Sequence, residues 1–243
     1  MKKMTILTLI LSMTLFAGIA VASNVNQVPY GSLTGTQLIT FDDLPLAGTP
    51  GNNYDSILVS GGASFAERFV GQTLSYSGNF DVLSGSTSGS LALQVGASNQ
   101  NINIFSGGYD GNVLTGLGKL GYPNYDAIGE GSFAVYFSSD QSQFGFQLVG
   151  GNNGNAYIGF YSRAGSLIET ITVSGLADAY YGFERDGAIK DIAGISIYND
   201  DLAGIAFDNL KHDVQSSVPE PATMILLGLG LMGLAGVRRK FQK

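Results

Sequence analysis

Three aspartates near the two ends of the central segment could together hold a hard cation. Asp42 and Asp43 follow Phe41, and Asp208 lies in the closing run Gly204–Leu210. Carboxylates with nearby backbone carbonyls form the oxygen shell that Ca²⁺ prefers. Only one of Asp42 and Asp43 can share a side with Asp208, because adjacent strand residues point to opposite faces. We therefore expect a structural calcium ion, held first by Asp208 and second by Asp43. A strand with one solvated face explains the Phe-Asp pattern equally well.

Tyrosines in expected loops could bind sugar. Tyr109, Tyr122 and Tyr125 lie near Asn and Asp residues in the sequence, and the chain has no Trp. A tyrosine ring can cover the apolar face of a pyranose, while neighbouring amides and carboxylates bond its hydroxyl groups. These three residues are the first candidates for glycan binding, and the other candidate tyrosines are Tyr157, Tyr161, Tyr180 and Tyr181. Tyr157 and Tyr161 fall in expected strands, where covering the edge of a sheet is the simpler interpretation.

The sequence does not predict an enzyme. The chain has no Cys and a single histidine, His212, so thiol catalysis is excluded and serine hydrolase or zinc chemistry is disfavoured. We expect His212 to be a solvated linker residue. A glycosidase needs two carboxylates around a bound sugar. The candidates are Glu130, which is expected in a turn, and Glu184, which is expected to form a surface ion pair with Arg185.

Hydrophobic residues alternate with a period of two along most of the chain, which is typical of strands with turn residues between them. The clearest runs are Leu38–Asp42, Ala63–Val70, Leu91–Val95, Asn101–Phe105, Phe133–Phe137, Phe144–Leu148, Ala156–Ser162, Leu167–Val173, Ile192–Tyr198 and Gly204–Leu210. Gly150–Asn155 offers the positive φ angles that tight hairpins need.

About ten to twelve short strands without a sustained helical period predict an all-β fold, a β-sandwich of the jelly-roll type. In that arrangement the first and last strands are neighbours, so that acidic groups on both strands could converge. A short helix is expected near Ser174–Tyr180, and residues 107–131 are expected to be the least regular stretch.

The N-terminus has the features of a signal peptide. Lys2 and Lys3 precede the apolar stretch Met4–Ala20, and Ala20-Val21-Ala22 fits a signal peptidase site. We expect cleavage after Ala22, so that residues 1–22 are removed by signal peptidase.

The C-terminus combines three features in a fixed order. Pro219-Glu220-Pro221 precedes an apolar stretch of about 24 Å if helical, residues 222–237, and Arg238, Arg239 and Lys240 follow it. The stretch is slightly shorter than a hydrocarbon core, and the basic residues can reach the interface. Positive flanks stay cytoplasmic, so such a helix would hold the preceding domain across the membrane.

Between these segments lies one expected domain, residues 23–217, followed by the C-terminal segment 218–243. Of the 12 basic and 19 acidic residues of the chain, six and one respectively fall in the terminal segments, which leaves a net charge of −12 for the central segment. A surface this acidic repels nucleic acid and anionic lipid, so neither is an expected partner.

The tripartite C-terminus resembles the PEP-CTERM sorting signal of Gram-negative bacteria that make extracellular polysaccharide. In that family the membrane protease exosortase reads the Pro-Glu-Pro motif and removes the tail. The resemblance implies an exported protein that is transiently anchored in the inner membrane and then reaches the cell surface or the extracellular (biofilm) matrix. A plain C-terminal anchor is the alternative.

The closing Phe207-Asp208-Asn209-Leu210 looks like the last strand of carbohydrate-binding-module jelly rolls, in which an aspartate binds structural calcium. Two functions follow from these resemblances. The first is a structural or interaction protein displayed at the surface or in the exopolysaccharide matrix. The alternative is a calcium-stabilised carbohydrate-binding module delivered by the same route.

Changing Pro219 and Pro221 to alanine tests the sorting motif. Because exosortase reads the Pro-Glu-Pro sequence, we expect the double variant to keep its C-terminal tail in the native host. Immunoblots with an antibody against the tail measure this, and normal release of the tail would show that the motif is not read.

Removing Ca²⁺ tests the calcium prediction. If Asp208 and Asp43 hold the ion in the folded state only, chelation should lower the melting temperature, because a ligand that binds only the folded state stabilises it. Melting curves with Ca²⁺ and with chelator measure the shift, and identical curves would contradict the prediction.

Overall fold

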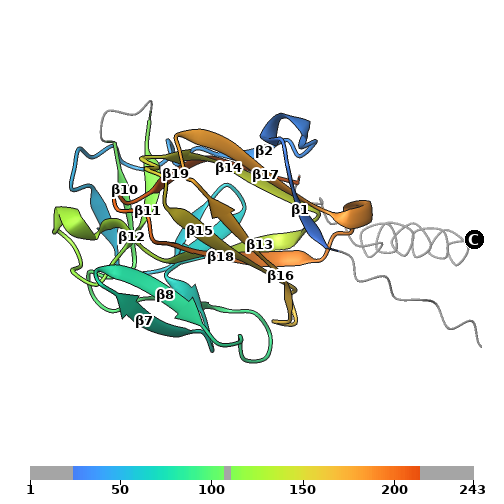
Figure 1. Ribbon diagram of the computed structural model, residues 1–243, viewed down its shortest axis with the longest axis horizontal. Coiled ribbons are helices and arrows are strands. Elements are labelled where there is room, and N and C mark those ends of the chain that lie inside the picture. The colour runs from blue at the N-terminus through green and yellow to red at the C-terminus, as the bar shows by residue number, and fades with distance from the viewer. Residues whose placement is uncertain (1–23, 107–110, 214–243) are drawn as a thin grey trace, which may run out of the picture.

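The computed structural model describes residues 24–106 and 111–213, which form an all-β fold with two main antiparallel sheets (Figure 1). The first sheet contains β1 (Val25–Val28), β2 (Gln37–Ile39), β3 (Asn52–Tyr54), β10 (Ile102–Phe105), β11 (Val113–Leu117), β12 (Ile128–Gly131), β14 (Gln143–Val149), β17 (Ala179–Arg185) and β19 (Ala206–His212). The second sheet contains β4 (Leu58–Ser60), β5 (Ala63–Ala66), β13 (Phe133–Gln141), β15 (Asn155–Tyr161), β16 (Leu167–Ser174) and β18 (Ile192–Asn199).

The smaller elements are two strand pairs and three 3-10 helices. These are β6 (Arg68–Phe69) with β9 (Leu93–Gln94), β7 (Thr73–Ser77) with β8 (Phe80–Ser84), η1 (Tyr30–Ser32), η2 (Tyr125–Ala127) and η3 (Asp186–Ala188). The first sheet has the order β1-β17-β14-β19-β11-β10-β3, with β2 paired to β19 and β12 to β11. The second has the order β16-β15-β18-β13-β5-β4.

The hydrophobic core fills the space between the two sheets. In β14, Phe144, Phe146 and Leu148 are buried in it, whereas Gln147 between them points to the other face. The ring of Phe146 lies 5.0 Å from that of Phe207, in an edge-on arrangement. Burying one such ring contributes roughly 1.5–3 kcal/mol. Period-two alternation therefore both builds the core and decides which side chains remain on the outer face.

The predicted neighbourhood of the opening and closing strands is confirmed. Strand β2 pairs antiparallel with β19, and Ile39 lies opposite Leu210 in the register. The all-β fold with two packed sheets agrees with the sequence pattern. The opening strand is shorter than expected, because Phe41 has a φ of 58° and turns its ring into the core.

Several sequence-based expectations about local structure were wrong. The Gly150–Asn155 cluster has the expected positive φ values at Gly150 and Asn153, but it carries the chain from β14 in the first sheet to β15 in the second and is no hairpin. No helix forms between Ser174 and Tyr180, where β16 ends and β17 begins. The stretch expected to be irregular contributes β11 and β12, which pair with each other.

His212 is a core residue rather than a solvated linker residue. Its side chain is only 2% exposed, because β19 continues to this position and points it inward like Leu210. The ring centroid lies 5.2 Å from that of Phe137, and Nδ1 lies 3.2 Å from Gln141 Oε1. Burial lowers the pKa of His212.

Asp213, the last residue described, is fastened to the sandwich. Its carboxylate accepts hydrogen bonds from Ser142 N at 2.6 Å and from Gln143 Nε2 at 2.7 Å. Lys190 Nζ lies 3.7 Å from the same carboxylate. These contacts therefore fix the end of β19 and the residue that follows it against the sandwich.

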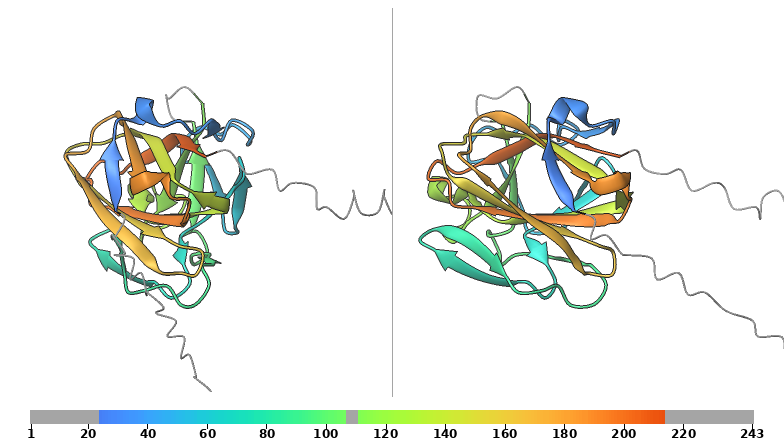
Figure 2. Two further views of the ribbon diagram at one scale, coloured as in Figure 1. Left: turned by 90° about the vertical axis from the view of Figure 1, so that its right-hand side faces the viewer. Right: turned by 45° about the vertical axis from the view of Figure 1, so that its right-hand side comes forward.

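The β7–β8 hairpin lies outside the second sheet in all three views (Figures 1 and 2). Asp81 of β8 anchors it: Oδ2 accepts hydrogen bonds from Ser132 N at 2.8 Å and from Ser132 Oγ at 3.2 Å. Burial raises the pKa of Asp81 to about 6, although the Ser132 hydrogen bonds and the charge of Arg68 oppose the shift.

The replacement Asp81→Asn tests this anchor. Because the folded-state pKa lies above the ordinary value of 3.8, the contribution of Asp81 to stability is complete below about pH 4 and is lost as the pH rises through 6. Asn keeps an oxygen for Ser132 and carries no charge. We expect the variant to be more stable than the unchanged protein at pH 7, by up to about 3 kcal/mol, and to differ little at pH 4.

Urea unfolding at the two pH values measures the difference. Asp178→Asn is the matched control, since Asp178 also accepts a backbone hydrogen bond, from Gly150 N at 2.6 Å, but is exposed. The control should show no comparable change with pH. Equal effects of Asp81→Asn at both pH values would show that Asp81 does not titrate in this range.

Candidate functional site

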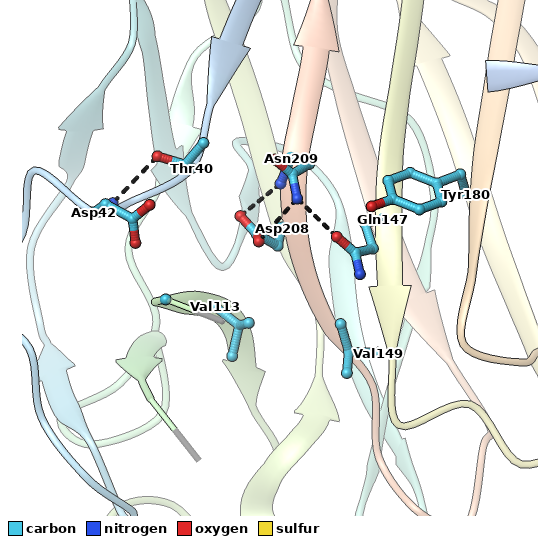
Figure 3. Close-up of a pocket in the computed structure, with 9 residues that line it drawn as sticks. Thr40, Asp42, Val113, Gln147, Val149, Tyr180, Asp208 and Asn209 are labelled. Atoms are coloured by element: carbon cyan, nitrogen blue, oxygen red, sulfur yellow. Dashed lines mark hydrogen bonds between the residues drawn. The ribbon is translucent and has the colours of Figure 1, made fainter. Parts of the chain in front are cut away.

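A cavity of about 550 Å³ opens on the outer face of the first sheet (Figure 3). We call it the polar pocket. Its lining comes from the segment after β2, the segment before β11 and the strands β11, β14, β17 and β19. The described lining residues are Thr40, Asp42, Gly111, Val113, Gln147, Val149, Tyr180, Asp208 and Asn209.

A β-bulge in β19 forms the floor of the polar pocket. Phe207 and Leu210 both belong to the core, although a regular strand would point residues three positions apart to opposite faces. The register against β14 shifts here, and Asn209 has a φ of 48°. Asn tolerates this left-handed conformation better than most residues. The bulge places Asp208 and Asn209 side by side on the outer face.

Hydrogen bonds hold the floor in one arrangement. Asn209 Nδ2 donates to Gln147 Oε1 at 2.7 Å and to Asp208 Oδ2 at 3.0 Å. The backbone N–H of Asn209 donates to Asp208 Oδ1 at 2.6 Å. The amide nitrogen of Gln147 points away from Asn209 and is thus placed to donate to a ligand (Figure 3). The floor is organised before any ligand arrives.

Asp42 enters the polar pocket from the segment after β2. Because Phe41 turns into the core, Thr40 and Asp42 remain on the pocket side. Asp42 Oδ1 accepts a hydrogen bond from Asn112 N at 3.0 Å. The buried Asn112 also donates from Nδ2 to Phe41 O at 2.9 Å and to Leu44 O at 3.1 Å. Asn112, which precedes β11, thus holds the turn from Phe41 to Leu44 in place.

An aromatic wall closes the other side of the polar pocket. Tyr180 is 53% exposed, and its ring centroid lies 5.0 Å from that of Tyr30. The hydroxyl group of Tyr30 donates to Asn209 O at 2.8 Å, and Lys211 Nζ lies 5.4 Å from the centre of the Tyr30 ring. Burial, followed by the influence of Tyr180 and Asp208, raises the pKa of Tyr30 to about 12. Tyr30 therefore stays protonated and supports Tyr180 from behind.

The chemistry of the lining suits a hydroxyl-rich neutral ligand. Asp42 and Asp208 supply carboxylate acceptors, Gln147 supplies an amide donor, and Tyr180 offers an accessible ring. None of the described lining residues is Lys, Arg or His. An anionic ligand would meet the two carboxylates of Asp42 and Asp208, which is unfavourable.

The predicted calcium ligands do not all meet. Asp42 and Asp208 line the same pocket, whereas the Asp43 carboxylate accepts a hydrogen bond from Ser60 Oγ at 3.1 Å and is not part of the lining. Within residues 24–106 and 111–213, no group of three or more His, Cys, Asp and Glu side chains could hold a metal ion. A cation in the polar pocket would need neutral oxygens, such as that of Thr40, to complete its shell. The calcium site stays a prediction.

Of the three tyrosines predicted for glycan binding, the structure describes Tyr122 and Tyr125, and these two lie outside the polar pocket. Tyr109 falls outside the described residues. Tyr122 is half-buried, and its hydroxyl group donates to Gly51 O at 3.3 Å. Tyr125 lies in η2 and is 64% exposed. Neither Tyr122 nor Tyr125 lines the polar pocket, and the aromatic side chain among its described lining residues is that of Tyr180.

The two acids considered for catalysis have separate environments. Burial, followed by the charge of Asp126, raises the pKa of Glu130 to about 7, and Glu130 lies in β12 rather than in a turn. The expected pairing of Glu184 with Arg185 was wrong. Arg185 is buried and instead donates to both carboxylate oxygens of Asp191, at 2.8 and 2.6 Å.

Sequence reasoning missed Gln147 and Asn209. The spacing of Phe207 and Leu210 in an otherwise period-two strand could have indicated the bulge, and with it the outward position of Asn209. Gln147 lies in a predicted strand as an outward residue. Its neighbours in the pocket come from distant segments, so the sequence around Gln147 does not indicate that it belongs to a site.

Comparison with known families concerns the C-terminus. The family model of the PEP-CTERM protein-sorting motif matches residues 217–240. The chain carries a PEP-CTERM sorting motif. The match confirms the resemblance seen in the sequence and supports export by the exosortase route, with processing by exosortase. Comparison of the chain with curated proteins gives no match.

The sorting residues themselves, Pro219, Glu220, Pro221, Arg238, Arg239 and Lys240, lie outside the described residues. So does the predicted membrane helix over 222–237. Among the residues that the structure does describe, no helix is both long and apolar enough to cross a membrane.

Proposed function

We propose that this exported PEP-CTERM protein is an interaction protein that binds a neutral glycan in the polar pocket, and that it is not an enzyme. After exosortase removes the tail, the domain acts at the cell surface or in the exopolysaccharide matrix of a Gram-negative bacterium. The observation that carries the proposal is the bulge in β19, which sets Asp208 and Asn209 side by side in the pocket that the exposed Tyr180 also lines.

The geometry favours glycan binding over a purely structural role. A structural β-sandwich does not require two carboxylates, two amides and an accessible tyrosine in one organised cavity. Sugar binding uses each of them: carboxylates and amides bond hydroxyl groups, and a ring covers the apolar face of a pyranose. The jelly-roll carbohydrate modules that the closing strand resembles give this interpretation a precedent.

A calcium-stabilised form of the same module is the second candidate. It is favoured by one specific observation, the presence of Asp42 and Asp208 in a single pocket. The two candidates differ in their dependence on the cation, since direct glycan binding persists in chelator and calcium-dependent binding is lost.

Removal of the ring and of one carboxylate tests the glycan site. We expect Tyr180→Ala and Asp208→Asn each to weaken binding of a neutral oligosaccharide by about tenfold, because central aromatic and charged contacts carry most of the binding energy of a site. Calorimetry with oligosaccharides of glucose, xylose, mannose and N-acetylglucosamine measures the affinity of the full chain in detergent micelles.

Tyr76→Ala is the matched control. Tyr76 is an exposed tyrosine of β7 that does not line the polar pocket. The control should bind like the unchanged chain and melt at a similar temperature. Unchanged affinity in both pocket variants would reject the polar pocket as the glycan site.

A further inference from the structure

A second groove lies between the β7–β8 hairpin and the outer face of the second sheet. Phe80 and Val82 of the hairpin, with Tyr157 and Tyr198 of the sheet, line a cavity of about 280 Å³. The same two tyrosines line a neighbouring cavity of about 220 Å³ that extends past Tyr161. The two cavities are neighbours that share these two side chains, and together we call them the hairpin groove.

The two tyrosines are fixed in position. Tyr157 and Tyr198 are cross-strand partners of β15 and β18, and their rings stack with centroids 4.7 Å apart at 17°. The hydroxyl group of Tyr157 donates to Asp200 Oδ2 at 2.9 Å, and Asn155 N donates to Asp200 Oδ1 at 2.6 Å. Rigid rings lose little side-chain entropy when they bind a ligand.

The composition of the hairpin groove narrows the class of ligand. Its described lining residues include no Lys, Arg or His, whereas Asp200 adds a carboxylate, so an anion is disfavoured. On the sheet side of the groove, the backbones of β15 and β18 pair with each other and offer no free edge to a peptide strand. Rigid rings beside a carboxylate and the hydroxyl group of Ser77 suit a neutral saccharide, which has apolar faces and a rim of hydroxyl groups.

We propose that the hairpin groove is a second saccharide-binding site, and that the domain crosslinks two polysaccharide chains. The polar pocket and the hairpin groove lie on the outer faces of different sheets, with the core between them. They therefore face in opposite directions, and one molecule can hold two chains. The crosslinking role rests on the proposed function of the polar pocket, whereas saccharide binding in the groove does not.

Counting the sites tests this inference. Calorimetry of the full chain in detergent micelles, with the oligosaccharide panel described above, should give two sites per chain, and the protein should increase the viscosity of the corresponding polysaccharide. Tyr198→Ala should weaken binding in the groove by about tenfold. It should thereby leave one measurable site and remove the increase in viscosity.

Tyr198→Phe keeps the ring, and Tyr76→Ala removes a ring of the hairpin that does not line the groove; both should retain two sites. If Tyr198→Ala does not fold by its melting curve, Phe80→Ala on the hairpin side replaces it. Two remaining sites in the folded groove variant, or no binding of any probe by the unchanged chain, would overturn the inference. Loss of all binding in Tyr198→Ala, with Tyr180→Ala unaffected, would support the groove and reject the polar pocket.

Discussion

Strand β19 must bury both Phe207 and Leu210 in the same core. The arrangement of the polar pocket on the outer face of the sheet follows from this constraint. In a regular strand Leu210 would point to solvent and Asn209 into the core. The bulge at Asn209 restores both apolar side chains to the interior and leaves Asp208 and Asn209 together outside. Core packing and site geometry are thus set by the same local distortion. A change that straightened this strand would alter both together.

The polar pocket exists only in the assembled fold, because its walls come from segments far apart in the chain. Asp42 follows an N-terminal strand, and Tyr180 lies in β17 with Tyr30 of η1 behind it. The pairing of β2 with β19 brings Asp42 to the floor of the polar pocket. Each wall is also fastened by a side chain that does not line the pocket, Asn112 for the turn and Tyr30 for the ring.

Sequence reasoning identified the fold class and part of the site. Alternation located most long strands, because burial of one face imposes a period of two. The adjacency of the opening and closing strands was also expected, but it brings Asp42 rather than Asp43 into the same pocket as Asp208. Sequence reasoning missed the β7–β8 hairpin, although Gly78 and Asn79 mark its turn between alternating runs. The role of Gln147 could not be predicted in this way, because its partners in the pocket come from segments far away in the sequence.

Because Asp213 is hydrogen-bonded to the sandwich, the distance between the folded domain and the sorting motif is limited during export. Five residues separate it from Pro219, and a fully extended chain gains at most about 3.6 Å per residue. The folded sandwich can therefore stand no further than about 20 Å from the first proline of the motif. A membrane protease that reads this motif must therefore reach it close beside the folded domain, or act before the last strand has docked.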